Sequence, residues 1–114
     1  MTRQPLPTRR PCVTMDTEWQ GIPMTVTVGL YPETGQPGEC FAGHAKDSRL
    51  CAQWADNCTA LSVAMQYGVP PADLAKSMGS TPFMAIIDGA VEMIDAPASP
   101  LGVIIGCVVQ EVRK

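Results

Sequence analysis

Aromatic side chains make up only 5% of this 114-residue sequence, charged side chains make up 17%, and histidine occurs once. With so few aromatics, a core has to be filled by aliphatic residues and by the 7 methionines, which adapt to irregular spaces. The 8 basic residues against 11 acidic ones give a net charge of −3, so no basic field is available to hold nucleic acid or an anionic membrane. The 46% of apolar residues excludes a disordered chain, and the length suits one domain.

The sequence also lacks a CxxC pair, a long apolar run and a charged start followed by an apolar segment. Its five cysteines are an odd number, so a disulfide framework is not expected. Apolar stretches such as Gly102–Val109 reach about half the length that a bilayer requires. We therefore expect a cytoplasmic protein with reduced thiols, without a signal peptide and without membrane contact.

Signatures of nucleotide-binding loops and of serine hydrolases are missing, since GxxxxGK[ST], GxGxxG and GxSxG do not occur. The weak candidate for metal or thiol chemistry is the pair Cys40 and His44. Four residues apart on a straight strand, their side chains would lie about 13 Å apart, too far to share one metal ion. Buried structural thiols are therefore favoured over a zinc site, and we predict no metal, no cofactor and no catalytic residue.

Residues 1–11 contain three prolines and are expected to form a flexible arm before a single domain, residues 12–114. Apolar residues alternate with others from Ile22 to Leu30, which predicts a strand with one buried face. Turn residues at 32–38 and an extended pattern at 39–45 indicate a hairpin, and 12–17 is a candidate third strand.

Helical periodicity begins after Lys46. Six apolar residues fall within a 100° arc, which predicts an amphipathic helix ending at Gly68: Leu50, Cys51, Trp54, Cys58, Leu61 and Met65. A short helix is expected over 72–78, a third over 82–94 after Ser80-Thr81-Pro82, and a fourth over 101–114 after Ser99-Pro100. The predicted fold is α+β: a small antiparallel β-meander or hairpin packed against three to four helices.

Predicted helix starts offer backbone N–H groups that could hold an anion. The candidate ligand-binding residues are those at and beside these starts: Lys46, Ser48, Arg49, Ser80, Thr81 and Ser99. Val63 and Tyr67 lie opposite the apolar arc of the first helix, which makes that side a candidate interface for self-association or for a larger partner.

Two motifs in the stretch Val26–Met78 resemble a known family. They are Val28-Gly29-Leu30-Tyr31 with Gly35-Gln36-Pro37-Gly38-Glu39, and Ala64-Met65-Gln66-Tyr67-Gly68-Val69-Pro70 with Leu74. The residue types of these motifs and their order along the chain are similar to those of the TSCPD domain near the C-terminus of adenosylcobalamin-dependent ribonucleotide reductases. Ala98-Ser99-Pro100 looks like the naming motif of that family, with Ser99 where its cysteine would stand and Leu101 where its aspartate would stand.

The resemblance implies a role in deoxyribonucleotide synthesis, with a reductase subunit or a nucleotide as partner. The radical barrel of such reductases needs several hundred residues, so we expect a stand-alone, non-catalytic binding or assembly domain. Two alternatives remain from the residues: a small metal- or thiol-dependent enzyme using Cys40 and His44, and a structural homo-oligomer.

Overall fold

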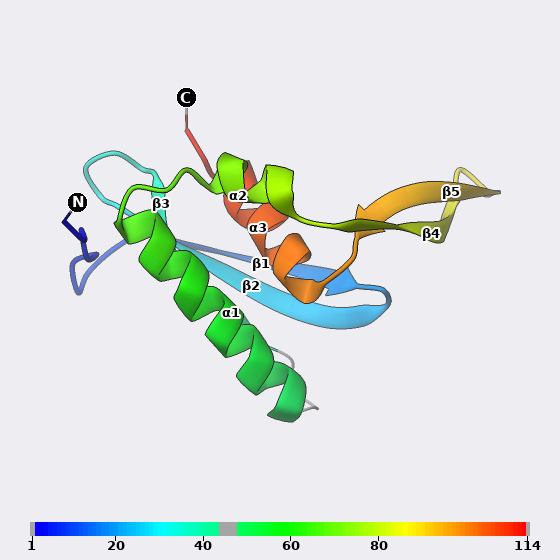
Figure 1. Cartoon of the computed structure of the whole chain (residues 1–114), viewed down its shortest axis with the longest axis horizontal. Coiled ribbons are helices and arrows are strands. Elements are labelled where there is room, and N and C mark those ends of the chain that lie inside the picture. The colour runs from blue at the N-terminus through cyan, green and yellow to red at the C-terminus, as the bar shows by residue number, and fades with distance from the viewer. Residues whose placement is uncertain (1, 44–47, 114) are drawn as a thin grey trace.

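Two antiparallel sheets and three helices follow one another along the chain in the computed structural model, which describes residues 2–43 and 48–113 (Figure 1). The elements are β1 (Cys12–Trp19), β2 (Ile22–Leu30), β3 (Pro37–Gly43), α1 (Ser48–Gln66), α2 (Pro71–Ser77), β4 (Ser80–Ile87), β5 (Ala90–Pro97) and α3 (Pro100–Gln110). The predicted α+β class is confirmed. None of the helices formed by the described residues combines the length and apolar content that crossing a bilayer requires.

The first sheet is a meander in the order β1-β2-β3, as the alternating pattern predicted. Gln20 and Gly21 form a two-residue turn with φ of 48° and 82°, the left-handed values of a type I′ turn, which allows β1 to pair with β2 over its full length. One face of the sheet is polar, where Thr14 bonds to Thr27 and the Thr25 hydroxyl donates to Asp16. The other face is apolar and belongs to the core.

The core lies between this sheet and helices α1 and α3, which both pack on its apolar face (Figure 1). The apolar arc predicted for the first helix is largely buried, and Trp54 at its centre is fully enclosed. The remaining core side chains come from alternate positions of β2, from Cys40 and from one side of α3: Met24, Val26, Val28, Leu30, Ile104, Ile105, Cys107 and Val108. Aliphatic, methionine and cysteine side chains therefore build most of it, as the composition required.

The helix predicted over 82–94 is wrong, because this segment is the β4–β5 hairpin. Asp88 and Gly89 have φ of 52° and 80°, and two successive left-handed residues end any helix and form the tight turn that joins two strands. Ser80 and Thr81 consequently lie in a strand and not at a helix start. The helices over 72–78 and after Ser99-Pro100 are confirmed as α2 and α3.

Candidate functional site

Two sequence motifs that lie far apart in the chain meet at one end of the first sheet. Gly38 and Glu39 begin β3, and Gln66 is the last residue of α1. Glu39 is 8% exposed and Gln66 is 6% exposed, and these are the buried polar or charged residues of the described chain. Because burying a polar side chain is unfavourable unless its hydrogen bonds are made, their partners define the site.

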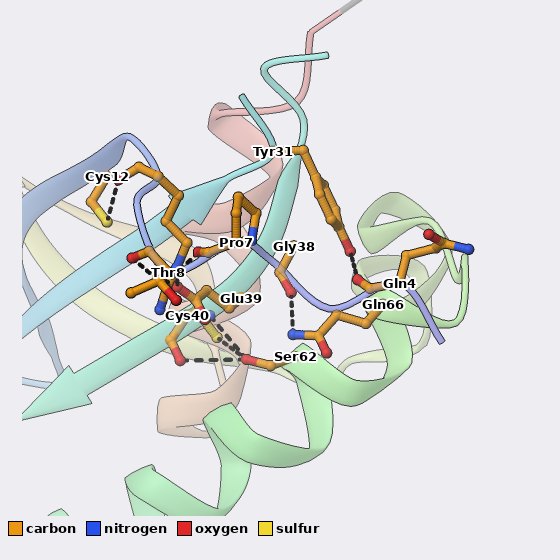
Figure 2. A network of polar contacts seen from close by, with 11 residues as sticks. Gln4, Pro7, Thr8, Cys12, Tyr31, Gly38, Glu39, Cys40, Ser62 and Gln66 are labelled. Carbon is orange, nitrogen blue, oxygen red and sulfur yellow. Dashed lines mark hydrogen bonds and ion pairs between the residues drawn. The ribbon is translucent and has the colours of Figure 1, made fainter. Parts of the chain in front are cut away.

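Gln66 connects three segments through its side chain and backbone. Its Nε2 donates to the Gly38 carbonyl oxygen over 3.0 Å, and its Oε1 accepts from Arg3 Nε over 2.7 Å. Its carbonyl oxygen accepts from the Gln4 backbone N–H over 2.8 Å. The Tyr31 hydroxyl in turn donates to the Gln4 carbonyl oxygen, so the proline-rich segment is bound to both motifs (Figure 2).

Arg10 holds the Glu39 side chain through an ion pair between Arg10 Nε and Glu39 Oε1. Arg10 also donates through Nη1 to the carbonyl oxygens of Pro7 and Thr8, and the Glu39 carboxylate raises the pKa of its guanidinium. The carboxylate lies over Gly29 on the neighbouring strand, where a Cβ atom would come within 2.9 Å of Glu39 Cδ. A side chain at position 29 would therefore force the Glu39 side chain out of this place.

A cavity of about 300 Å³ opens between β3 and α1 beside these groups. That volume is at the lower end for small-molecule sites. Its lining combines polar residues around the contact between Gly38 and Gln66, here called the motif contact, with smaller or apolar residues from β3 and α1. The lining residues are Arg3, Glu39, Cys40, Phe41, Ala42, Ala55, Cys58, Thr59, Ser62, Val63 and Gln66. Phe41 is 54% exposed, so its ring presents an apolar surface to solvent at this site.

Cys40 forms part of the cavity wall but is 1% exposed. Its backbone N–H donates to Ser62 Oγ over 2.9 Å (Figure 2), and its Sγ lies 3.8 Å from the Cys58 carbonyl oxygen. The hydrogen bond with the Cys58 side chain and then burial raise the pKa of the Cys40 thiol. Such a thiol stays protonated at neutral pH, where the nucleophile and metal ligand would be the thiolate.

The candidate ligand residues that the structure describes lie on three elements: Ser48 and Arg49 on α1, Ser80 and Thr81 on β4, and Ser99 at the start of α3. The helix start predicted at Ser80 and Thr81 is wrong, because both residues lie in a strand. Ser99 does cap α3, and its side chain already accepts from the Gly102 N–H over 3.2 Å. Ser48 begins α1 and Arg49 is exposed in its first turn, whereas Lys46 and His44 lie outside the described residues.

The predicted interface residues lie near the motif contact. Val63 is half-buried in the cavity wall, and Tyr67 is exposed beside a second cavity, of about 330 Å³, which also borders Gln66. In the part of the chain that the structure describes, no group of three or more His, Cys, Asp and Glu side chains could hold a metal ion.

Sequence reasoning did not assign roles to the residues that build this site: Arg3, Arg10, Glu39, Ser62 and Gln66. Glu39 and Gln66 were within the two recognised motifs, so their place in those motifs was an available signal. Arg3 and Arg10 lie in a segment without periodicity, and no local pattern could have shown that they reach residues 63 and 29 positions away.

One curated protein similar to this chain is a vitamin B12-dependent ribonucleotide reductase from Rhodopirellula baltica (strain DSM 10527 / NCIMB 13988 / SH1). The two are 39% identical over 82 residues, which is 71% of this chain and 8% of the reductase. This chain therefore carries a ribonucleotide reductase-related region. No protein-family model matches the chain, and no solved structure matches it. The chain thus spans less than a tenth of the length of that reductase.

Proposed function

We propose that this chain is a TSCPD-type accessory domain linked to ribonucleotide reduction. It serves as a binding or assembly module for a partner and does not itself reduce ribonucleotides. The observation that carries the proposal is the 39% identity over 82 residues with a vitamin B12-dependent ribonucleotide reductase. The contact between the Gly38-Glu39 and Gln66 motifs supports it, because the motifs that resemble the family form one structural unit here.

The cavity beside this unit is the proposed binding surface. It combines hydrogen-bonding groups on Arg3, Glu39 and Gln66 with the exposed ring of Phe41. A guanidinium and an amide suit a nucleotide's phosphate and base edges, while an exposed aromatic ring beside polar groups is also typical of protein contact surfaces. A reductase subunit and a nucleotide are thus the two partners to test.

The alternative of a thiol enzyme receives no support from the Cys40 environment. That role requires a thiolate, and both the contact with Cys58 and burial raise the pKa of Cys40. His44 lies outside the described residues, so its pairing with Cys40 stays a prediction.

Isothermal titration calorimetry with ribonucleoside and deoxyribonucleoside phosphates, and with a B12-dependent reductase lacking this segment, tests the proposal. The variant Ala55→Arg places a long charged side chain at an exposed position of the cavity wall and leaves the core intact. Ala52→Arg, also exposed on α1 but outside that wall, is its matched control.

We expect one partner class to bind the wild-type chain and Ala52→Arg, and to bind Ala55→Arg at least tenfold more weakly. Failure of all these partners to bind the wild-type chain would contradict the proposed function. Equal binding by both variants would place the binding surface elsewhere on the domain.

A further inference from the structure

The half of the β4–β5 hairpin next to its turn carries large apolar side chains on one face. The strands pair in register so that Met84 is opposite Met93 and Ile86 is opposite Val91. Side chains alternate between the faces of a sheet, so these four residues share one face, here called the outer hairpin face. Phe83, Ile87, Glu92 and Ile94 belong to the other face.

The outer hairpin face is exposed to an unusual degree. Its four residues are 62–77% exposed, with Ile86 the highest, whereas Phe83 on the opposite face is half-buried. Together they present roughly 400–500 Å² of apolar surface, which is as large as the largest patch on a typical monomer, and such patches are often functional.

The hairpin extends away from the rest of the molecule, as Figure 1 shows for the strands at its right-hand end. Its base is connected by the hydrogen bond from the Ala98 N–H to the Gly79 carbonyl oxygen, 3.0 Å, and β5 contacts α3. An isolated two-stranded hairpin is marginally stable in water. Packing of the outer hairpin face against a partner would therefore stabilise the strands as well as remove apolar surface from water.

We propose that the partner is a second copy of this chain, with the two outer hairpin faces stacked across a two-fold axis. Such an interface uses the same patch on both subunits, so the patch must be self-complementary. A face of two methionines, an isoleucine and a valine meets this condition, because none of the four brings a charge against its own copy and methionine adapts its shape.

The area of the outer hairpin face also suits an interface with a second copy of the chain. Two stacked outer hairpin faces with their rims bury roughly 1,000 Å² in total, the lower limit for a specific interface. Of the charged residues of the hairpin, Glu92 lies on the opposite face and Asp88 in the turn. Asp95, opposite Pro82, lies on the same side of the hairpin as the four residues of the outer hairpin face, next to Met93 at the end away from the turn. This proposal does not depend on the proposed link to ribonucleotide reduction.

Sedimentation equilibrium of the wild-type chain over a wide concentration range tests the proposal. Two neighbouring isoleucines offer a matched pair of variants, because Ile86 lies on the outer hairpin face and Ile87 on the opposite one. Ile86→Lys introduces a charge at the centre of the proposed interface, and Ile87→Lys introduces the same charge one residue away. Glu92→Lys is a further control on the opposite face, and circular dichroism checks that each variant is folded.

We expect the wild-type chain, Ile87→Lys and Glu92→Lys to reach a mass of twice 12.2 kDa at high concentration, and a folded Ile86→Lys to stay at 12.2 kDa. A wild-type chain that is monomeric at every concentration overturns the proposal, even if a reductase subunit then binds the same face. A dimer that survives in Ile86→Lys also overturns it, because the contact would then use another surface such as that of Val63 and Tyr67.

Discussion

Replacement of Gln66 by leucine tests whether the contact between the two motifs stabilises the domain. Gln66 is 6% exposed, and Gln66→Leu keeps a side chain of similar size while removing both of its polar groups. The Gly38 carbonyl oxygen, which is buried and receives the Nε2 hydrogen bond over 3.0 Å, loses this donor. Arg3 loses its acceptor as well, but because Arg3 is exposed, its guanidinium forms hydrogen bonds with water instead.

The size of the effect follows from these two losses. A buried carbonyl left without its donor costs about 1–3 kcal/mol, whereas the exposed Arg3 adds well under 1 kcal/mol. We therefore expect Gln66→Leu to lower the free energy of unfolding by about 2 kcal/mol, out of a total of about 5–15 kcal/mol for a domain of ordinary stability. The melting temperature of a domain this size should fall by roughly 8 °C.

Urea unfolding followed by the fluorescence of the buried Trp54 measures this change directly. Gln53→Leu is the matched control, since Gln53 is an exposed glutamine on the same helix and its replacement should change stability by less than about 0.5 kcal/mol. If Gln66→Leu unfolds at the same urea concentration as Gln53→Leu, the motif contact contributes nothing and the reasoning is refuted.

Two further predictions concern the same region. Gly38→Ala should destabilise the domain by about 1–3 kcal/mol, because its Cβ would lie 2.7 Å from Tyr31 Cζ and 2.8 Å from Leu6 Cδ1. Gly43→Ala on the same strand meets nothing within 4 Å, so equal melting temperatures for the two variants would show that the space around Gly38 is not restricted. In N-ethylmaleimide labelling followed by mass spectrometry, exposed Cys12 should be modified in the native protein, while Cys40 stays unmodified up to mildly alkaline pH. The contact with Cys58 and burial raise the pKa of Cys40, so this thiol ionises only well above the usual range; labelling of Cys40 as fast as Cys12 would contradict this environment.

The first half of the fold and α3 were predictable because their local signals agree with one another. In β2, alternation and β-branched residues both favour a strand, and in α3 the Ser99 cap, Pro100 and the apolar spacing all favour a helix. Between residues 80 and 97 the signals conflict. Ile86, Ile87, Ala90 and Ile94 have helical spacing, but the Asp88-Gly89 dipeptide is a strong hairpin signal, and the turn prevails because both residues adopt left-handed angles.

The candidate site was less predictable than the fold. Its central contact joins residues 28 positions apart, and the contact of Arg3 with Gln66 spans 63 positions. Helix starts are visible in a single sequence, which is why Ser99 was found, whereas the partner of a buried glutamine depends on how whole elements pack. The family resemblance included Gly38, Glu39 and Gln66, but only the structure shows that Gln66 bonds to Gly38.

The long separation between Arg3 and Gln66 also has a consequence for the order of folding during synthesis. Arg3 is synthesised 63 residues before Gln66, its hydrogen-bond partner at the end of α1. Until then Arg3 has no such acceptor, whereas Gln4 and Arg10 in the same segment find their partners earlier, in Tyr31 and Glu39. Pro5, Pro7 and Pro11 suit this delay, because they lack the backbone donors that a premature helix or sheet would need. The contact of Arg3 with α1 can therefore form only after the residues of the whole meander have been synthesised.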